Sequence, residues 1–266
     1  MKKFTLLLMS LLMVSIFALA QKKLCVHTIY GEKIEYIASD VAYIDFEDIA
    51  TDPDDDPVVP VVPKPDAGIP DANGYEYVDL GLSSGLLWAT MNVGADSPED
   101  YGDYFAWGET EPKDEYNWST YKWCEGSNDT QTKYCTHSYY GTVDNKTILE
   151  LSDDAANANW GGDWRMPTKA EQEELVEECT WDWTTQNGVN GYKVTSKTNG
   201  NSIFLPATGY HYFSDLYDAG SSGLYWSSSL LTGYSYDAYV LNFNSSLVDW
   251  YSGYRYYGLS VRPVMK

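Results

Sequence analysis

Residues 81–85 read Gly-Leu-Ser-Ser-Gly, which matches the G-x-S-x-G pattern of hydrolase nucleophile elbows. In such an elbow a strand leads into a sharp turn and the turn leads into a helix, which exposes the serine hydroxyl to a base. Here residues 86–90 are typical of a second strand, and the context indicates no triad partner. We therefore predict a strand–turn–strand unit and give Ser83 no catalytic role.

Carboxylates are the second group that could do chemistry. Asp153 and Asp154 are adjacent, and acidic residues crowd the segment after Thr168: Glu171, Glu173, Glu174, Glu177 and Glu178. Paired carboxylates do acid–base work in glycosidases, and surplus ones supply the oxygen ligands that calcium takes. The commoner roles are a solvated helix face and a loop acid that pairs with Arg or caps backbone amides. We expect these structural roles and no cofactor, since no motif supports calcium.

The cysteines and histidines do not form a metal-binding pattern. The four cysteines, Cys25, Cys124, Cys135 and Cys179, lack the spacing of zinc ligands, and the histidines are scattered. Cys124 and Cys135 bracket a polar loop, so we predict that they form a disulfide, worth about 2–3 kcal/mol in the chain-entropy model. The partners of Cys25 and Cys179 stay open, because four cysteines allow three connectivities.

The aromatic residues give the clearest indication of binding. Residues 232–257 are dense in Tyr, Asn, Ser, Asp and Gly, the composition of binding loops, because Tyr offers a large amphipathic surface at low entropic cost. In the strand expected over 239–244, the face that carries Leu241 and Phe243 should point inward. The residues predicted to bind ligand then lie outside or on loops: Tyr234, Tyr236, Asp237, Asn242, Asn244, Asp249, Tyr251, Tyr254 and Tyr256.

The expected elements are one clear helix and many short strands. Thr168 and Glu171 form a capping box, and the helix that they start should end near Cys179. Residues 192–197 and 201–205 read as a hairpin around Asn199-Gly200. Further strands are expected at 75–80, 86–93, 225–227, 239–244 and 260–262. The predicted class is α+β, with few helices and many short irregular strands. Trp160, Trp164 and Trp226 are expected in the core.

The beginning of the chain has the pattern of a cleavable signal peptide over residues 1–20. Lys2 and Lys3 precede an apolar run, and Ala18-Leu19-Ala20 gives a small-x-small cleavage site. The run is shorter than the roughly 20 residues of a spanning helix. We predict export to the periplasm, the cell surface or the extracellular space, with no membrane span after cleavage.

Three parts follow the signal peptide. Residues 21–49 should form a small β unit with a hairpin of strands 26–30 and 33–37 and a third strand at 41–46. Residues 50–73 hold six of the eleven prolines and read as a semi-rigid linker. Residues 74–266 are long enough for one domain with a substantial core.

The net charge limits the partners. It is −22 for the whole chain and becomes −24 when Lys2 and Lys3 are removed with the signal peptide. Such a surface repels nucleic acid and anionic membranes, which bind clusters of Lys and Arg. The charge does not identify the ligand of the predicted binding surface, which we expect to be a protein or a glycan.

Five ordered blocks resemble a known family. They are 77–82 (YVDLGL) with 87–90 (LWAT), 102–109 (GDYFAWGE), 164–168 (WRMPT), 225–229 (YWSSS) and 258–264 (GLSVRPV). Together they look like the major paralogous domain first named from Fibrobacter succinogenes, which is common in exported Bacteroidetes proteins. The resemblance covers residues 75–264 and implies a C-type lectin-like fold, akin to that of formylglycine-generating enzymes.

The end of the chain further resembles the variable region of target proteins that retroelements diversify. In those proteins adenine-directed mutagenesis changes surface positions on a lectin-fold scaffold. Here Tyr, Asn, Ser and Asp positions alternate with a frame of Trp226, Leu241, Phe243, Arg255, Gly258 and Arg262. The resemblance therefore implies a display surface that is diversified at its exposed positions.

The chain departs from these families where enzymes and true lectins carry their chemistry. The oxidase activity of the formylglycine-generating relatives needs reactive cysteines late in the domain, and none follows Cys179; Met91 stands where relatives often have a cysteine. Glu111-Pro112 is followed by Lys113, so the calcium-and-sugar motif of lectins is also missing. We predict a binding protein without enzymatic activity. The alternatives left open are a structural surface or matrix protein and a carboxylate-dependent, glycan-active enzyme.

Overall fold

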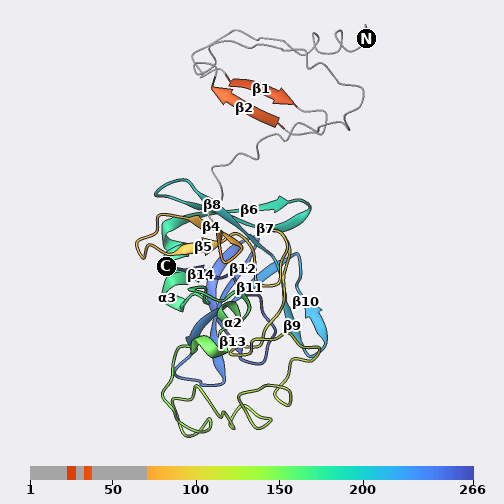
Figure 1. The fold of residues 1–266 in the computed structure, drawn as a ribbon. Coiled ribbons are helices and arrows are strands. Elements are labelled where there is room, and N and C mark those ends of the chain that lie inside the picture. Colours follow the sequence, from red (N-terminus) through yellow and green to blue (C-terminus); the bar gives the residue numbers. More distant parts are fainter. Residues whose placement is uncertain (1–22, 28–32, 38–70) are drawn as a thin grey trace, which may run out of the picture. The chain divides into compact units, whose positions relative to one another are not determined.

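A computed structural model describes residues 23–27, 33–37 and 71–266 of the chain, which divides into one unit over 1–62 and another over 63–266 (Figure 1). In the first unit β1 (Lys23–His27) and β2 (Lys33–Ile37) pair antiparallel, with Lys23 opposite Ile37. This confirms the predicted hairpin, although its first strand begins three residues earlier than expected. The predicted signal peptide, the third strand and most of the linker lie outside the described residues.

The second unit consists mainly of antiparallel strands in small sheets with few helices, which confirms the broad α+β class (Figure 1). One sheet has the order β14-β5-β4-β3, a second β6-β7-β8 and a third β11-β12-β13, while β9 and β10 form a hairpin. The strands are β3 (Asp71–Ala72), β4 (Tyr75–Asp79), β5 (Leu87–Ala89), β6 (Cys179–Gln186), β7 (Val189–Ser196), β8 (Ser202–Pro206), β9 (Tyr210–Tyr212), β10 (Asp215–Tyr217), β11 (Ser222–Leu230), β12 (Asp237–Asn244), β13 (Leu247–Tyr254) and β14 (Val264–Met265). The helices are η3 (Leu151–Asp153), α2 (Ala155–Trp160) and α3 (Lys169–Glu178).

Helix α3 begins at the predicted capping box and ends just before Cys179. The Thr168 hydroxyl accepts from the Glu171 amide, and the Glu171 carboxylate accepts from the Thr168 amide at 2.7 Å. Arg165 holds the same carboxylate through two bonds of 2.7 Å. The helix packs against β11, β12 and β6, so it supports the third sheet. The predicted hairpin is also confirmed, as β7 and β8.

The β11-β12-β13 sheet lies between two hydrophobic clusters. Trp226 and Val240 belong to one cluster, whereas Leu241 and Phe243 belong to the other. Strand β12 is therefore buried on both faces along much of its length, and the prediction that only one face of 239–244 points inward is wrong. The cause is the second layer of aromatic residues, which no local pattern in β12 reveals. Trp160, Trp164 and Trp226 are all buried, as predicted.

Several strand assignments also differ from the prediction, and β6, β9 and β10 were not expected. Residues 247–254 form β13, which was not predicted because polar residues and tyrosines interrupt its apolar pattern. Residues 260–262, predicted as a strand, make only an isolated bridge between Ser260 and Tyr225. The last regular strand is β14, which pairs with β5 and so joins the end of the domain to its beginning.

The predicted disulfide between Cys124 and Cys135 is not formed, since both residues are free cysteines. The Cys124 thiol lies 3.2 Å from the Trp118 carbonyl and the Cys135 thiol lies 3.2 Å from the His137 carbonyl. Each thiol thus has a separate backbone acceptor. Cys179 is also free and lies in the core, where burial raises its pKa to about 11.

The side chain of Arg255 is fully buried at the end of β13. Its guanidinium donates to Tyr121 Oη and to Gln131 Oε1 at 2.8 Å each. It also donates to three carbonyls: Lys133 at 3.0 Å, Tyr134 at 3.3 Å and Ser235 at 2.8 Å. The same group lies 4.9 Å from the centre of the Trp107 ring. One side chain thus joins the irregular 121–135 segment to β13 and to the loop before β12.

We predict that Arg255→Met lowers the free energy of unfolding by about 3–5 kcal/mol, because it leaves several buried acceptors without a donor. Arg255→Lys should recover only part of this loss, since an ammonium lacks the planar donor fork. Chemical denaturation monitored by circular dichroism measures the effect. Lys146→Met is the control: its ion pair with Glu150 is exposed, so the change should be below about 1 kcal/mol. Equal losses in Arg255→Met and in the control would show that the Arg255 network is not structural.

Candidate functional site

Two adjoining hollows lie along the third sheet, and we name each after one residue. The Asp237 hollow has a volume of about 340 Å³, and its lining residues are Tyr236, Asp237, Tyr251, Ser252, Tyr254 and Tyr257. The Asn242 hollow has a volume of about 280 Å³, and its lining residues are Tyr210, Asp218, Ser222, Leu224, Asn242, Asn244, Tyr251 and Tyr257. Tyr251 and Tyr257 belong to both walls, so the two hollows adjoin.

Strand pairing places lining residues of the hollows on β11, β12 and β13 next to one another. The antiparallel pairing of β12 with β13 sets Asp237 opposite Tyr254 and Asn242 opposite Asp249. The pairing of β11 with β12 sets Leu224 opposite Asn242. Side chains from different strands are therefore neighbours on each face of the sheet, with Asp237, Ser252 and Tyr254 on one face and Leu224, Asn242 and Tyr251 on the other.

Most of the residues predicted to bind ligand lie at these hollows. The lining includes Tyr236, Asp237, Asn242, Asn244, Tyr251 and Tyr254. Tyr234 does not line either hollow, but it is 51% exposed and its ring centroid is 5.8 Å from that of Tyr236. Asp249 is exposed on β13 beside the Asn242 hollow without lining it.

Tyr256 was predicted at the surface and is instead buried, with only 6% of its area exposed. Its ring packs edge-on against Trp118 at 4.7 Å and stacks on Tyr254 at 5.6 Å. The chain turns at Arg255 and Tyr256, so the alternation of β13 stops there and both side chains point inward. Tyr256 therefore supports the surface from beneath.

Sequence reasoning missed several tyrosines of this surface. Tyr257 lines both hollows, and Tyr210 packs on it with ring centroids 5.6 Å apart. Tyr217 stacks on Tyr210 at 5.6 Å, and Tyr140 meets Tyr236 edge-on at 5.1 Å. Tyr210 and Tyr217 come from the β9–β10 hairpin, Tyr140 from the irregular 121–150 segment, and Tyr257 from the segment after β13. The indications of them in the sequence were the density of tyrosine around 210–217 and, for Tyr257, its place at the end of the Tyr-rich stretch 232–257.

Asp237 is the charged group of the Asp237 hollow. Its Oδ2 accepts from the Ser252 hydroxyl at 3.3 Å, while its Oδ1 is buried without a hydrogen-bond partner. Among the described residues it has no ion-pair partner either. Burial raises the pKa of this carboxyl to about 6, because little compensates its charge. A positive charge in the hollow would stabilise the ionised form of this carboxylate.

The acidic residues that could suggest catalysis have structural partners. Asp154 caps α2 by accepting from the amides of Ala156 and Asn157, and it also accepts from the Met166 amide at 2.8 Å. Asp153 forms an ion pair with Lys133 and accepts from the Tyr134 hydroxyl at 2.7 Å. In the described part of the chain, no cluster of three or more His, Cys, Asp or Glu is arranged to hold a metal ion.

The G-x-S-x-G segment is a turn between β4 and β5, as predicted, and not an elbow before a helix. The Ser83 hydroxyl donates to Glu178 at 2.5 Å, and the Ser84 amide donates to Glu174 at 2.6 Å. These contacts fasten the turn to α3 and account for two of the crowded glutamates. Ser83 thus serves to position the turn.

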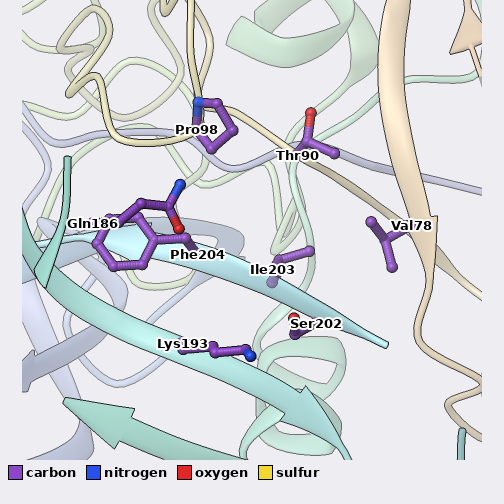
Figure 2. A pocket seen from close by; sticks show the side chains of 8 residues that line it. All are labelled: Val78, Thr90, Pro98, Gln186, Lys193, Ser202, Ile203 and Phe204. Carbon is purple, nitrogen blue, oxygen red and sulfur yellow. The ribbon is translucent and has the colours of Figure 1, made fainter. Parts of the chain in front are cut away.

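A third pocket of about 380 Å³ lies between β4 and the β7–β8 hairpin (Figure 2). Its lining residues are Val78, Thr90, Pro98, Gln186, Lys193, Ser202, Ile203 and Phe204. None of the predicted site residues lies here. Its only charged lining residue is Lys193, so the pocket offers neither a carboxylate pair nor the polar aromatic surface of the other two hollows.

Comparison with known proteins identifies one family. Residues 168–264 match a family described as a domain of unknown function (DUF8237). This match runs from the cap of α3 to β14 and so contains the third sheet and all the lining residues of the two hollows. No curated protein and no solved structure matches the chain. Among the described residues, no helix is long and apolar enough to cross a membrane.

We predict that Asp237→Asn stabilises the protein at alkaline pH. The folded pKa of about 6 exceeds the ordinary value of 3.8, so the folded protein holds this proton more tightly than the unfolded chain. The charged carboxylate therefore costs stability above pH 6, and the cost shrinks as the carboxyl is protonated in acid. After allowance for its partial exposure, the gain should be about 1 kcal/mol at pH 8 and smaller at pH 4.5. Denaturation of both variants at the two pH values measures it, and a loss at pH 8 would show that the carboxylate has a stabilising partner.

Proposed function

We propose that this protein is an exported binding protein without enzymatic activity, whose C-type lectin-like domain recognises a protein or a glycan through the Asp237 and Asn242 hollows. The observation that carries the proposal is the convergence of tyrosine and polar side chains on these two adjoining hollows. Concave sites with a few polar groups are the usual form of ligand sites. The fold and the export rest on the sequence resemblance and on the signal pattern.

The chemistry of the surface suits recognition by contact. Tyrosine rings present flat apolar faces with a hydroxyl edge, and Asn and Asp side chains add hydrogen-bonding groups between them. Tyr251 and Tyr254 are 58% and 41% exposed, so their rings are accessible to a partner. The carboxylates near the hollows support binding and not hydrolysis, because no pair of them stands on opposite sides of either hollow in the lining described.

Packing supports the proposal of a diversified surface. Five of the frame residues have at most 2% of their surface area exposed: Trp226, Leu241, Phe243, Arg255 and Arg262. The hollow-lining residues on β12 and β13 are at least partly exposed. Substitutions at the exposed positions would alter the binding surface and leave the two hydrophobic clusters unchanged. A matrix protein whose tyrosines only pack would not need this separation.

Alanine substitutions at the exposed tyrosines test the binding function. We expect Tyr251→Ala and Tyr254→Ala each to weaken binding at least tenfold, because exposed aromatic side chains contribute most to such contacts. The measurement is biolayer interferometry of the wild type against purified glycans and exported proteins, followed by the variants on each ligand found. The melting temperature of Tyr251→Ala should stay within about 2 °C of the wild type.

Leu151→Ala is the matched control, since Leu151 is 54% exposed on η3 and lines neither hollow. It should bind as the wild type does. Binding that survives loss of both tyrosines would contradict the proposal and favour a purely structural role. Turnover of a glycan that is abolished by changing one carboxylate would instead establish an enzyme.

Sequencing the 3′ end of this gene in many isolates of one lineage tests diversification. We expect substitutions at exposed positions such as Tyr251 and Asn242, confined to Asn-type codons between Trp226 and Arg262. The buried frame should not change, because large-to-small substitutions in a core cost about 2–5 kcal/mol. A uniform 3′ end, or substitutions spread evenly over frame and surface, would overturn the idea of a diversified surface and leave a fixed binding domain.

A further inference from the structure

We propose that the Asp237 hollow binds a positively charged organic group, the guanidinium or ammonium of a basic side chain on a partner protein. This inference rests on the proposed binding function and names the chemistry of its ligand. Three observations support it: the composition of the hollow, the uncompensated carboxylate, and the way in which this fold accommodates its own cations.

The walls of the hollow are aromatic. The hollow is lined by four tyrosines together with Asp237 and Ser252; the tyrosines are Tyr236, Tyr251, Tyr254 and Tyr257. The centroids of the Tyr236 and Tyr254 rings are 6.0 Å apart, and those of Tyr254 and Tyr257 are 5.6 Å apart. A cation within about 6 Å of a ring centroid is attracted by the negative face of the ring. Most of the accessible surface of the hollow is polar, so a cation bound there would contact polar atoms more than ring faces.

Elsewhere in the domain, cations already sit in such surroundings. The Lys133 ammonium lies 4.8 Å from the ring centroids of Trp123 and of Tyr134, and it also pairs with Asp153. Lys169 lies over Tyr239 and Trp250, at 5.2 Å and 5.4 Å, and pairs with Glu173. The Asp237 hollow repeats this combination of rings and a carboxylate, but no Lys or Arg is among its described lining residues.

The charged groups near Asp237 do not neutralise it. Arg255 follows Tyr254 in the chain, but its guanidinium is directed to Tyr121, Gln131 and Ser235. The titratable groups around the hollow are the four tyrosines of its wall, Tyr140 beside Tyr236, and Asp218 in the adjoining Asn242 hollow. None of these groups can carry a positive charge. Lys169 of α3 lies over the rings of Tyr239 and Trp250, further along the same strands, and is paired with Glu173. A partner's cation would therefore meet an unopposed negative charge.

The hollow selects the class of partner. A neutral glycan would place hydroxyls on the rings but would leave the carboxylate charge uncompensated. A metal ion would need several oxygen or nitrogen ligands, and the described residues offer no such cluster here. A basic side chain supplies the positive charge that the hollow lacks, and a volume of about 340 Å³ is ample for its head group.

Isothermal titration of the mature protein with small probes tests this inference. The probes are Nα-acetyl-arginine amide, Nα-acetyl-lysine amide and the neutral isostere Nα-acetyl-citrulline amide. We expect at least one basic probe to bind tenfold or more tightly than citrulline. In Asp237→Asn this preference should disappear, and in Asp182→Asn, which removes an exposed carboxylate on β6 that lines neither hollow, it should persist.

The affinity of the basic probe should also fall about tenfold between pH 7.5 and pH 5. The carboxyl has a pKa of about 6 before ligand binds, so at pH 5 about nine-tenths of it is protonated and uncharged. Asp237→Asn should show no such dependence. Thermal melting of each variant verifies that it is folded.

Equal binding of arginine and citrulline probes, retained preference in Asp237→Asn, or no binding of any probe to the wild type would each overturn the inference. The binding function itself is judged separately, on the ligands found in the wider panel. If Tyr251→Ala abolishes binding of a neutral glycan while no basic probe binds, the binding function stands and the cation site does not.

Discussion

The buried guanidinium of Arg255 is the constraint on which the rest of the domain depends. A charge without access to water must have its donors satisfied, and here all its described acceptors are neutral: a phenol, an amide and three carbonyls. The backbone must therefore bring the irregular 121–135 segment and the loop before β12 to the end of β13. Arg262 sets a similar condition, since it is buried and donates to Asn92, Ala89 and Thr90. These two side chains give order to segments that have little regular structure.

The hollows follow from this arrangement. Arg255 points inward between Tyr254 and Tyr256. It therefore determines where the side chains of β13 stop alternating between the two sheet faces, which leaves Tyr254 exposed and Tyr256 buried. The 121–135 segment that it holds leads to Tyr140, which packs against Tyr236. The wall of the Asp237 hollow is thus connected to the most strongly buried charge among the described residues.

The features that could be predicted from the sequence depend on neighbours in the chain. The capping box of α3, the β7–β8 hairpin and the turn at 81–85 involve residues that are a few positions apart. The features that were missed depend on distant contacts: β13 is defined by its pairing with β12, and Tyr256 is buried by Trp118. Composition pointed to six residues of the hollows, but Tyr140, Tyr210 and Tyr257 join them only through the tertiary fold. The spacing of Cys124 and Cys135 in the sequence likewise does not reveal that both thiols are free and that each has its own backbone acceptor.

The packing of Tyr256 beneath Tyr254 has a thermodynamic consequence. Tyr254 is in contact with the rings of Trp118, Tyr256 and Tyr257, so its rotamers are already restricted in the free protein. Side-chain entropy that is lost during folding is not lost again when a partner arrives. Under the proposed binding function, a ligand would therefore meet a surface that needs little ordering. Loosening the buried ring of Tyr256 would then make association entropically more costly, even though every exposed side chain remained in place.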